Sequence, residues 1–153
     1  MHLRSDLERK ALHGVDELTR LPDEAYSADA SRRVYDVMAD KARLVLGARH
    51  AVVVDAVFSS PAEREAFERL ADACGVPFVG IWLEADGATL LERVEARKGD
   101  ASDATGSVVR RQSARGVGAI AWTVIDAGGT VAEVQSMAMA IVRRAIPECS
   151  ILR

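Results

Sequence analysis

The chain has 153 residues, of which 49% are hydrophobic and 28% are charged, and its mean hydropathy is +0.03. This composition excludes an intrinsically disordered protein, and no apolar run approaches the roughly 18 residues of a membrane-spanning helix. The net charge of −3 gives no basic surface for nucleic acid or acidic membranes. We therefore expect one soluble domain over residues 1–153 that binds neither nucleic acid nor membrane.

Four short segments predict β-strands. Residues 51–56, 78–85 and 122–127 are apolar runs bounded by polar or turn residues, which is typical of central strands. A further short strand is expected at 2–5, directly before a helix. The runs contain Trp82 and Trp122, which we expect to be packing residues.

Helical patterns alternate with these strands. Ser60 and Glu63 form a capping box around Pro61, so a helix should start there and end near Gly75. Thr130 begins a second capping box and a closing helix that ends at Pro147. Other helices are expected from about Leu7 to Leu18, from before Val34 to Gly47, and from Asp86 to near Gly99. This alternation predicts an α/β fold, a three-layer α/β/α sandwich around a mostly parallel sheet.

Residues 96–118 form the least core-like stretch, with several arginines among small polar residues. We interpret it as a mobile basic flap that could close over phosphate groups, since arginine makes bidentate contacts with them. Arg93 and Arg97 share a helix face at the start of this flap. Alternatively, both are solvated surface charges paired with Glu92 or Glu95.

Two aspartates stand where a parallel sheet binds ligands, at the carboxyl ends of strands. Asp55 follows three valines and could hold Mg²⁺ through water, or it could accept backbone hydrogen bonds in a turn. Asp6 follows the first strand and could accept a proton from a substrate hydroxyl, with Arg9 one turn later to orient an anion. The alternative for Asp6 is a plain helix N-cap.

Other kinds of site find no support in the sequence. The three histidines have no ligand spacing with each other or with Cys74 and Cys149, so no histidine or cysteine metal site is predicted. No GxSxG elbow accompanies the serines. A receiver-like domain with Asp55 as phospho-acceptor fails, because no acidic pair ends an earlier strand and no lysine ends the strand at Trp122. The cysteine usage and the absence of a secretory h-region in the sequence favour the cytoplasm.

Five blocks stand in a fixed order along the chain: LRSDLERK (3–10), HGVDELTRLPDEAYS (13–27), VVVDAVFSSPAERE (52–65), GVPFVGIWLEA (75–85) and RVEARKGDASDA (93–104). Together they resemble the gluconate-kinase-like P-loop kinase domain. The resemblance is closest to the ATP-binding half of bacterial proteins that pair it with an aminoglycoside-phosphotransferase-like domain, and it runs from about Leu3 to Gly129.

The resemblance implies an ATP- and Mg²⁺-dependent kinase that phosphorylates a small hydroxylated molecule. Asp6 would be the catalytic, substrate-side aspartate, with Arg9 as a second substrate-binding residue. Asp55 would be the aspartate near Mg²⁺. Arg93 and Arg97 would be lid arginines that contact the cofactor, with Arg97 counted among the catalytic residues. Asp103 would shape the lid rather than take part in chemistry.

The chain departs from this family in one decisive respect, because no GxxxxGK[ST] phosphate loop occurs in it. That loop supplies the backbone N–H cradle, the phosphate-binding lysine and a hydroxyl on Mg²⁺. The family's first strand, which carries it, lies between the strands that correspond here to 51–56 and 78–85. We therefore expect these two strands to pair directly in a four-stranded sheet, or to receive a strand from another polypeptide, with a homodimer as one possibility.

The sequence leaves two functional hypotheses. The chain is a small-molecule kinase domain that is inactive or incomplete without a phosphate loop, or it is a non-catalytic module that binds a metabolite or a partner. A misplaced start, an expressed fragment and a natural truncation are equally open explanations of the missing loop.

Overall fold

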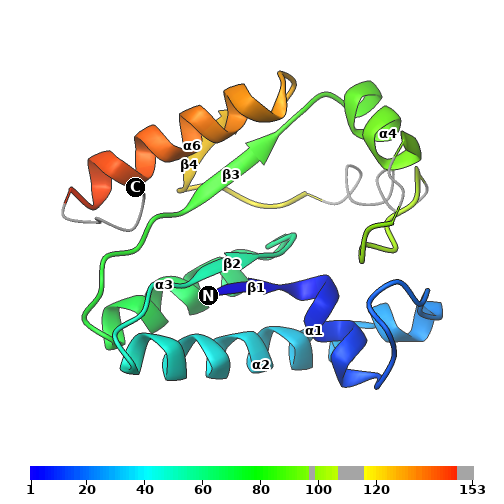
Figure 1. Ribbon diagram of the computed structural model, residues 1–153, viewed down its shortest axis with the longest axis horizontal. Coiled ribbons are helices and arrows are strands. Elements are labelled where there is room, and N and C mark those ends of the chain that lie inside the picture. Colours follow the sequence, from blue (N-terminus) through cyan, green and yellow to red (C-terminus); the bar gives the residue numbers. More distant parts are fainter. Residues whose placement is uncertain (97–98, 107–115, 148–153) are drawn as a thin grey trace.

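The computed structural model describes residues 1–96, 99–106 and 116–147, and within them the chain has an α/β architecture with parallel strand pairs (Figure 1). The four predicted strands are all present, though shorter than expected. Strand β1 (His2–Arg4) pairs in parallel with β2 (Val53–Asp55), and β3 (Ile81–Glu84) pairs in parallel with β4 (Thr123–Asp126).

The helices begin where the sequence places strong capping signals. Both predicted capping boxes are formed, with the Ser60 and Glu63 side chains at the start of α3 and the Thr130 and Glu133 side chains at the start of α6. The helices and the single 3-10 turn are α1 (Ser5–Leu12), η1 (Asp23–Tyr26), α2 (Ala28–Gly47), α3 (Pro61–Ala73), α4 (Gly87–Ala96) and α6 (Val131–Ala145). None of these helices is long and apolar enough to cross a bilayer.

Helix α1 is shorter than the sequence pattern suggests. The apolar spacing predicts a helix to Leu18, but α1 ends at Leu12. Gly14 adopts a φ of 65°, a left-handed conformation that ends helices and that glycine adopts at little cost. The chain beyond Gly14 turns back instead, and the Val15 N–H donates to the Lys10 carbonyl.

The expected four-stranded sheet does not form. In the described part of the chain the strands make two separate two-stranded sheets, so β2 and β3 are not hydrogen-bonded to each other. The prediction of direct pairing between the strands at 51–56 and 78–85 is therefore wrong. In Figure 1 the β1–β2 pair lies on α2 and α3, and the β3–β4 pair lies under α6.

The hydrophobic core belongs to the first sheet and its helices. In contrast, α4 and α6 contain no fully buried residue. Trp82 and Trp122 pack against the core as predicted, and the Trp122 ring lies edge-on to Phe58 with 5.1 Å between ring centroids. The core cluster consists of Leu3, Val34, Met38, Ala42, Phe58, Phe67 and Leu70.

A cavity of about 2520 Å³ separates the two sheets, and it is lined by residues of β2, β3 and β4. Apolar strand residues are exposed there: Val53 is 62% exposed and Leu83 is 56% exposed. We call this space the inter-sheet gap. The second strand pair buries Ile125 but turns part of its apolar surface toward the gap.

Candidate functional site

The carboxyl ends of β1 and β2 bring the two predicted aspartates to one edge. Asp55 ends β2 and lies opposite Arg4 in the strand register, and the Arg4 Nε is 3.5 Å from the Asp55 Oδ2. The same arginine donates from Nη2 to Asp100 at 3.2 Å, which brings the segment 99–106 to this edge. Asp6 follows in the first turn of α1. Parallel pairing thus brings Asp6 and Asp55 to the same edge of the first sheet, and their roles there stay predictions.

Asp6 is not an N-cap. The N-cap of α1 is Arg4, and its side chain makes no capping bond, so the alternative interpretation of Asp6 is wrong. Burial raises the pKa of the Asp6 carboxyl above its usual 3.8, while a hydrogen bond with Ser102 and the charges of Arg9 and Arg4 act in the opposite direction. A desolvated carboxyl with a raised pKa at a strand end is suited to accept a proton.

Asp55 is the more exposed of the two carboxyls. Its side chain is 58% exposed, its ion-pair partner is Arg4, and the His2 Nε2 lies 4.0 Å from its Oδ2. Among the hydrogen bonds of the described residues none is a backbone N–H donating to Asp55, so the turn-forming alternative has no support. An exposed carboxylate at a strand end is a suitable ligand for a hydrated magnesium ion.

Helix α1 carries three consecutive buried charges, Glu8, Arg9 and Lys10, which point to different neighbours. Glu8 pairs with Lys41 of α2 at 2.5 Å. Lys10 reaches Asp103 and the carbonyl of Thr19. A helix that is charged on successive residues is normally exposed, so burial of all three shows that α1 is enclosed by polar partners.

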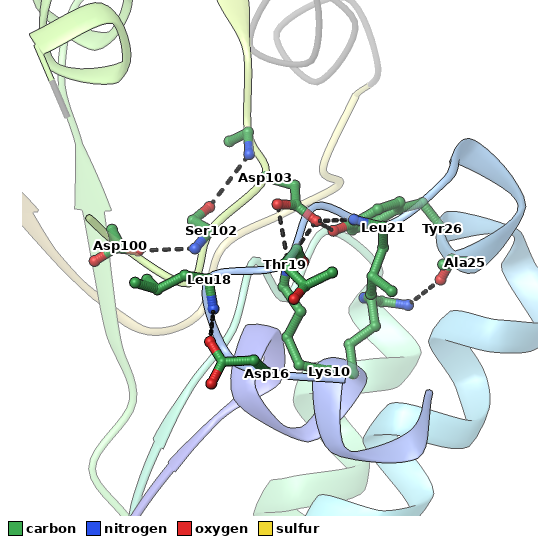
Figure 2. A network of polar contacts seen from close by, with 12 residues as sticks. Lys10, Asp16, Leu18, Thr19, Leu21, Ala25, Tyr26, Asp100, Ser102 and Asp103 are labelled. Carbon is green, nitrogen blue, oxygen red and sulfur yellow. Dashed lines mark hydrogen bonds and ion pairs between the residues drawn. The ribbon is translucent and has the colours of Figure 1, made fainter. Parts of the chain in front are cut away.

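Asp103 joins three segments that are far apart in the sequence (Figure 2). Its carboxylate accepts hydrogen bonds from Lys10 Nζ at 2.9 and 2.8 Å, from the Leu21 N–H at 3.0 Å and from the Tyr26 hydroxyl. Burial alone would raise the pKa of Asp103, but the hydrogen bonds from Lys10, Tyr26 and Leu21 outweigh it and hold the pKa below its usual value. The network fastens the segment 99–106 onto α1.

The sequence analysis missed the role of Lys10. Its Nζ binds a carboxylate 93 positions later in the chain, and the side chain is only 2% exposed. No local pattern distinguishes this lysine from a surface lysine, since its partner is brought to it by the tertiary fold.

Of the two predicted lid arginines, the described residues include Arg93 but not Arg97. Arg93 donates to the carbonyls of Ala127 at 2.6 Å, Gly128 at 3.3 Å and Gly129 at 2.7 Å, which ties α4 to the turn before α6. None of the ion pairs found in the described segments involves Arg93. Arg97 lies outside the described residues. A contact of either arginine with phosphate remains a prediction.

The loop after β2 does not form a binding site for the phosphates of a nucleotide triphosphate. In the loop after β2, the Phe58 N–H donates to the Tyr35 hydroxyl at 2.9 Å and the Ser60 N–H donates to Glu63 at 3.0 Å. These backbone groups are therefore engaged and do not form a cradle for phosphate oxygens. The described segments also hold no cluster of three or more histidine, cysteine or acidic side chains that could bind a metal ion by themselves. The chain's own residues do not fit ATP, and we derive no phosphoryl-transfer step from them.

Comparison with known proteins places this fold in a family. Residues 1–117 match the model of a family described as an AAA domain. Three mycobacterial proteins, one from Mycobacterium bovis and two from Mycobacterium tuberculosis, are each 34% identical over 82 residues and carry the name uncharacterized protein. The match covers 54% of this chain and 16% of each relative. The chain therefore belongs to this AAA domain family, a family of P-loop kinase-like proteins.

Proposed function

We propose that the chain forms the acceptor side of an ATP-dependent small-molecule kinase, a phosphotransferase that acts on an alcohol group. The observation that carries the proposal is the Asp6 carboxyl, which is desolvated, has a raised pKa and lies at the strand edge beside Asp55. A base with a raised pKa is better matched to a proton from a hydroxyl at neutral pH. The resemblance to gluconate-kinase-like domains supports a small hydroxylated acceptor.

In this proposal each residue has a limited role. Asp6 accepts the proton of the acceptor hydroxyl, and Arg9 helps to bind the acceptor. Asp55 holds Mg²⁺ through water, and Arg93 and Arg97 take the part of lid arginines that contact the phosphates, which for Arg93 requires it to leave the carbonyls of residues 127–129. ATP with Mg²⁺ would supply the phosphoryl group.

We further propose that a parallel β-strand followed by a phosphate-binding loop completes the site by entering the inter-sheet gap. It would come from another polypeptide or from a longer form of this protein. Both flanking sheets are parallel, and Val53 and Leu83 expose apolar side chains there. A strand with the same direction as β2 would end near Asp55, which is where a phosphate cradle is needed.

One observation favours the second hypothesis, a non-catalytic module that binds a metabolite or partner. The backbone N–H groups of Phe58 and Ser60 and the guanidinium of Arg93 are all engaged by protein acceptors. A site with so few free donors is suited to a ligand other than a triphosphate.

Calorimetric titration distinguishes the two hypotheses. The chain is titrated with ATP and Mg²⁺ alone and again with a synthetic peptide of five β-branched residues followed by GxxxxGKT. The kinase proposal expects magnesium-dependent binding only with the peptide, and loss of that binding in Asp55→Ala. Asp72→Ala, an exposed aspartate on α3, is the matched control. Peptide binding without any nucleotide binding would refute the kinase proposal and support the non-catalytic module.

A further inference from the structure

The second sheet and its helices have little buried surface. Within these described elements, α4 and α6 contain no buried residue, and Ile125 is the buried residue of β3 and β4. On α6, Val131 is 84% exposed and Met137 is 41% exposed. Burial of apolar surface is the main favourable contribution to folding. These elements are therefore weakly stabilised compared with the first sheet and its helices, where Leu3 and Met38 are at most 3% exposed.

The contacts that join these four elements to the first sheet and its helices gather at one place. Just before β4, the Trp122 Nε1 donates to Glu68 of α3 at 2.6 Å. Arg64 of α3 donates to two backbone carbonyls in residues 117–119, and its guanidinium lies 5.6 Å from the centroid of the Trp82 ring. In the described residues, no hydrogen bond or ion pair runs from β3, α4, β4 or α6 themselves to the first sheet or its helices. The four elements are therefore held near the amino ends of their strands.

Elements with so few buried contacts open at a lower free energy than the rest of a protein. Native proteins open in cooperative units that often coincide with supersecondary motifs. Here the motif is the parallel pair β3–β4, with α4 between its strands in the sequence and α6 after them. We call these four elements the second unit. The segment 99–106 stands outside it, because it is fastened to α1.

A strand in the inter-sheet gap would change this balance. The edge of β3 away from β4 has no strand partner in the described part of the chain. Leu83 of β3 lines the gap together with residues of α6, among them Val134 and Val142. An added strand would bond to the free edge and cover these side chains. It would therefore bind the closed second unit in preference to the opened one, which stabilises the closed form.

We propose that the second unit opens separately from the first sheet, and that the strand which fills the inter-sheet gap holds it closed. The partner would thereby regulate the side of the site that carries Arg93. Because α4 belongs to the second unit, Arg93 has a defined position only while that unit is closed. The inference rests on the proposed function for the partner strand and for the role of Arg93. The separate opening of the second unit rests on the burial and contacts of this chain alone.

Amide hydrogen exchange of the full chain, measured by mass spectrometry, tests the separate opening. The α6 amides are compared with those of α2, a helix that buries Val34, Met38 and Ala42. We expect the protection of α6 to be at least about tenfold lower than that of α2. The exchange of the unmodified chain gives this result without the need for any variant to fold.

A synthetic peptide of five β-branched residues, without a phosphate loop, tests the coupling. Its dissociation constant is measured by calorimetry. At about 100 times that constant, mass action should raise the protection of α6 about 100-fold. A control peptide with proline at its third position cannot complete the hydrogen-bond ladder and should leave the protection unchanged.

Two matched leucine variants locate the effect in the gap. Leu83→Lys places a charge in the gap and should limit the peptide-induced rise to about tenfold or less, because lysine protects exposed strand edges from pairing. Leu44→Lys changes a leucine of α2 that is 75% exposed and lies outside the lining of the gap. It should leave the rise within about twofold of that in the unmodified chain.

The outcomes separate this inference from the proposed function. Equal protection of α6 and α2 in the free chain, or an α6 protection that the strand peptide leaves unchanged, would overturn the inference. A rise in α6 protection with the strand peptide, but no nucleotide binding in the chain completed by the GxxxxGKT peptide, would retain the inference and refute the kinase proposal.

Discussion

Asp103→Asn tests whether the Lys10–Asp103 pair holds the flap segment onto the fold. Asparagine is nearly the same size as aspartate, so the substitution removes the charge and part of the acceptor capacity while preserving the shape. Lys10 would then be a buried ammonium without a counter-charge, bonded to the carbonyl of Thr19 and at most to an amide oxygen. Leaving this buried charge unpaired destabilises the folded state.

The expected loss follows from the burial of the two partners. Removing one partner of a buried ion pair typically costs about 3–5 kcal/mol. The Lys10 side chain is 2% exposed and the Asp103 side chain is 12% exposed, so some water reaches the carboxylate. We therefore expect a loss of about 3 kcal/mol, near the lower end of that range.

Urea unfolding followed by the fluorescence of Trp82 and Trp122 measures the loss. The double variant Lys10→Met with Asp103→Leu replaces the pair by apolar side chains and should lose about 2 kcal/mol less than the sum of the single variants. The pKa of Asp103 is lowered in the folded protein, so its contribution is present above 3.8, the unfolded value, and is lost as the pH falls through the lower folded value. A loss under about 1 kcal/mol at pH 7, or strict additivity in the double variant, would refute the reasoning.

Two further substitutions test the site and the packing between the sheets. Burial raises the pKa of Asp6, so its ionised form destabilises the folded state above the folded pKa. Asp6→Asn should therefore be more stable than the natural chain at pH 7, and urea titrations should show this advantage shrinking as the pH falls toward 3.8. A stability difference between the two proteins that does not change with pH would contradict this prediction. Gly80→Ala would place a Cβ 2.3 Å from the Trp122 ring, so it should lower the free energy of unfolding by about 1–3 kcal/mol and alter the tryptophan emission. Gly47→Ala is the control, because the space around Gly47 is open and the folded state should not be destabilised. Equal unfolding midpoints for the two variants would show that Trp122 is free to move.

Signals within a few residues of sequence were sufficient to predict where helices α3 and α6 begin. The capping boxes at Ser60 and Thr130 involve residues only three positions apart, so the sequence contains all the information that the helix starts need. The shared edge of Asp6 and Asp55 could also be predicted, because parallel strands align their carboxyl ends.

Other features depend on contacts that no local pattern records. Whether the strands ending at Asp55 and Glu84 pair depends on hydrogen bonds across the sheet, and apolar composition is the same for a paired and an unpaired strand. The pairing of Lys10 with Asp103 is equally non-local.

The exposed strand edges of the inter-sheet gap also affect how the chain behaves at high concentration. Unpaired backbone groups beside exposed apolar side chains such as Val53 and Leu83 can recruit any available β-strand, and natural proteins usually protect such edges with charges or cover. A strand that completes the site and a strand of an aggregating molecule would therefore bind the same backbone hydrogen-bonding groups. A ligand strand that binds there would act as a solubilising agent for the chain as well as a component of its site.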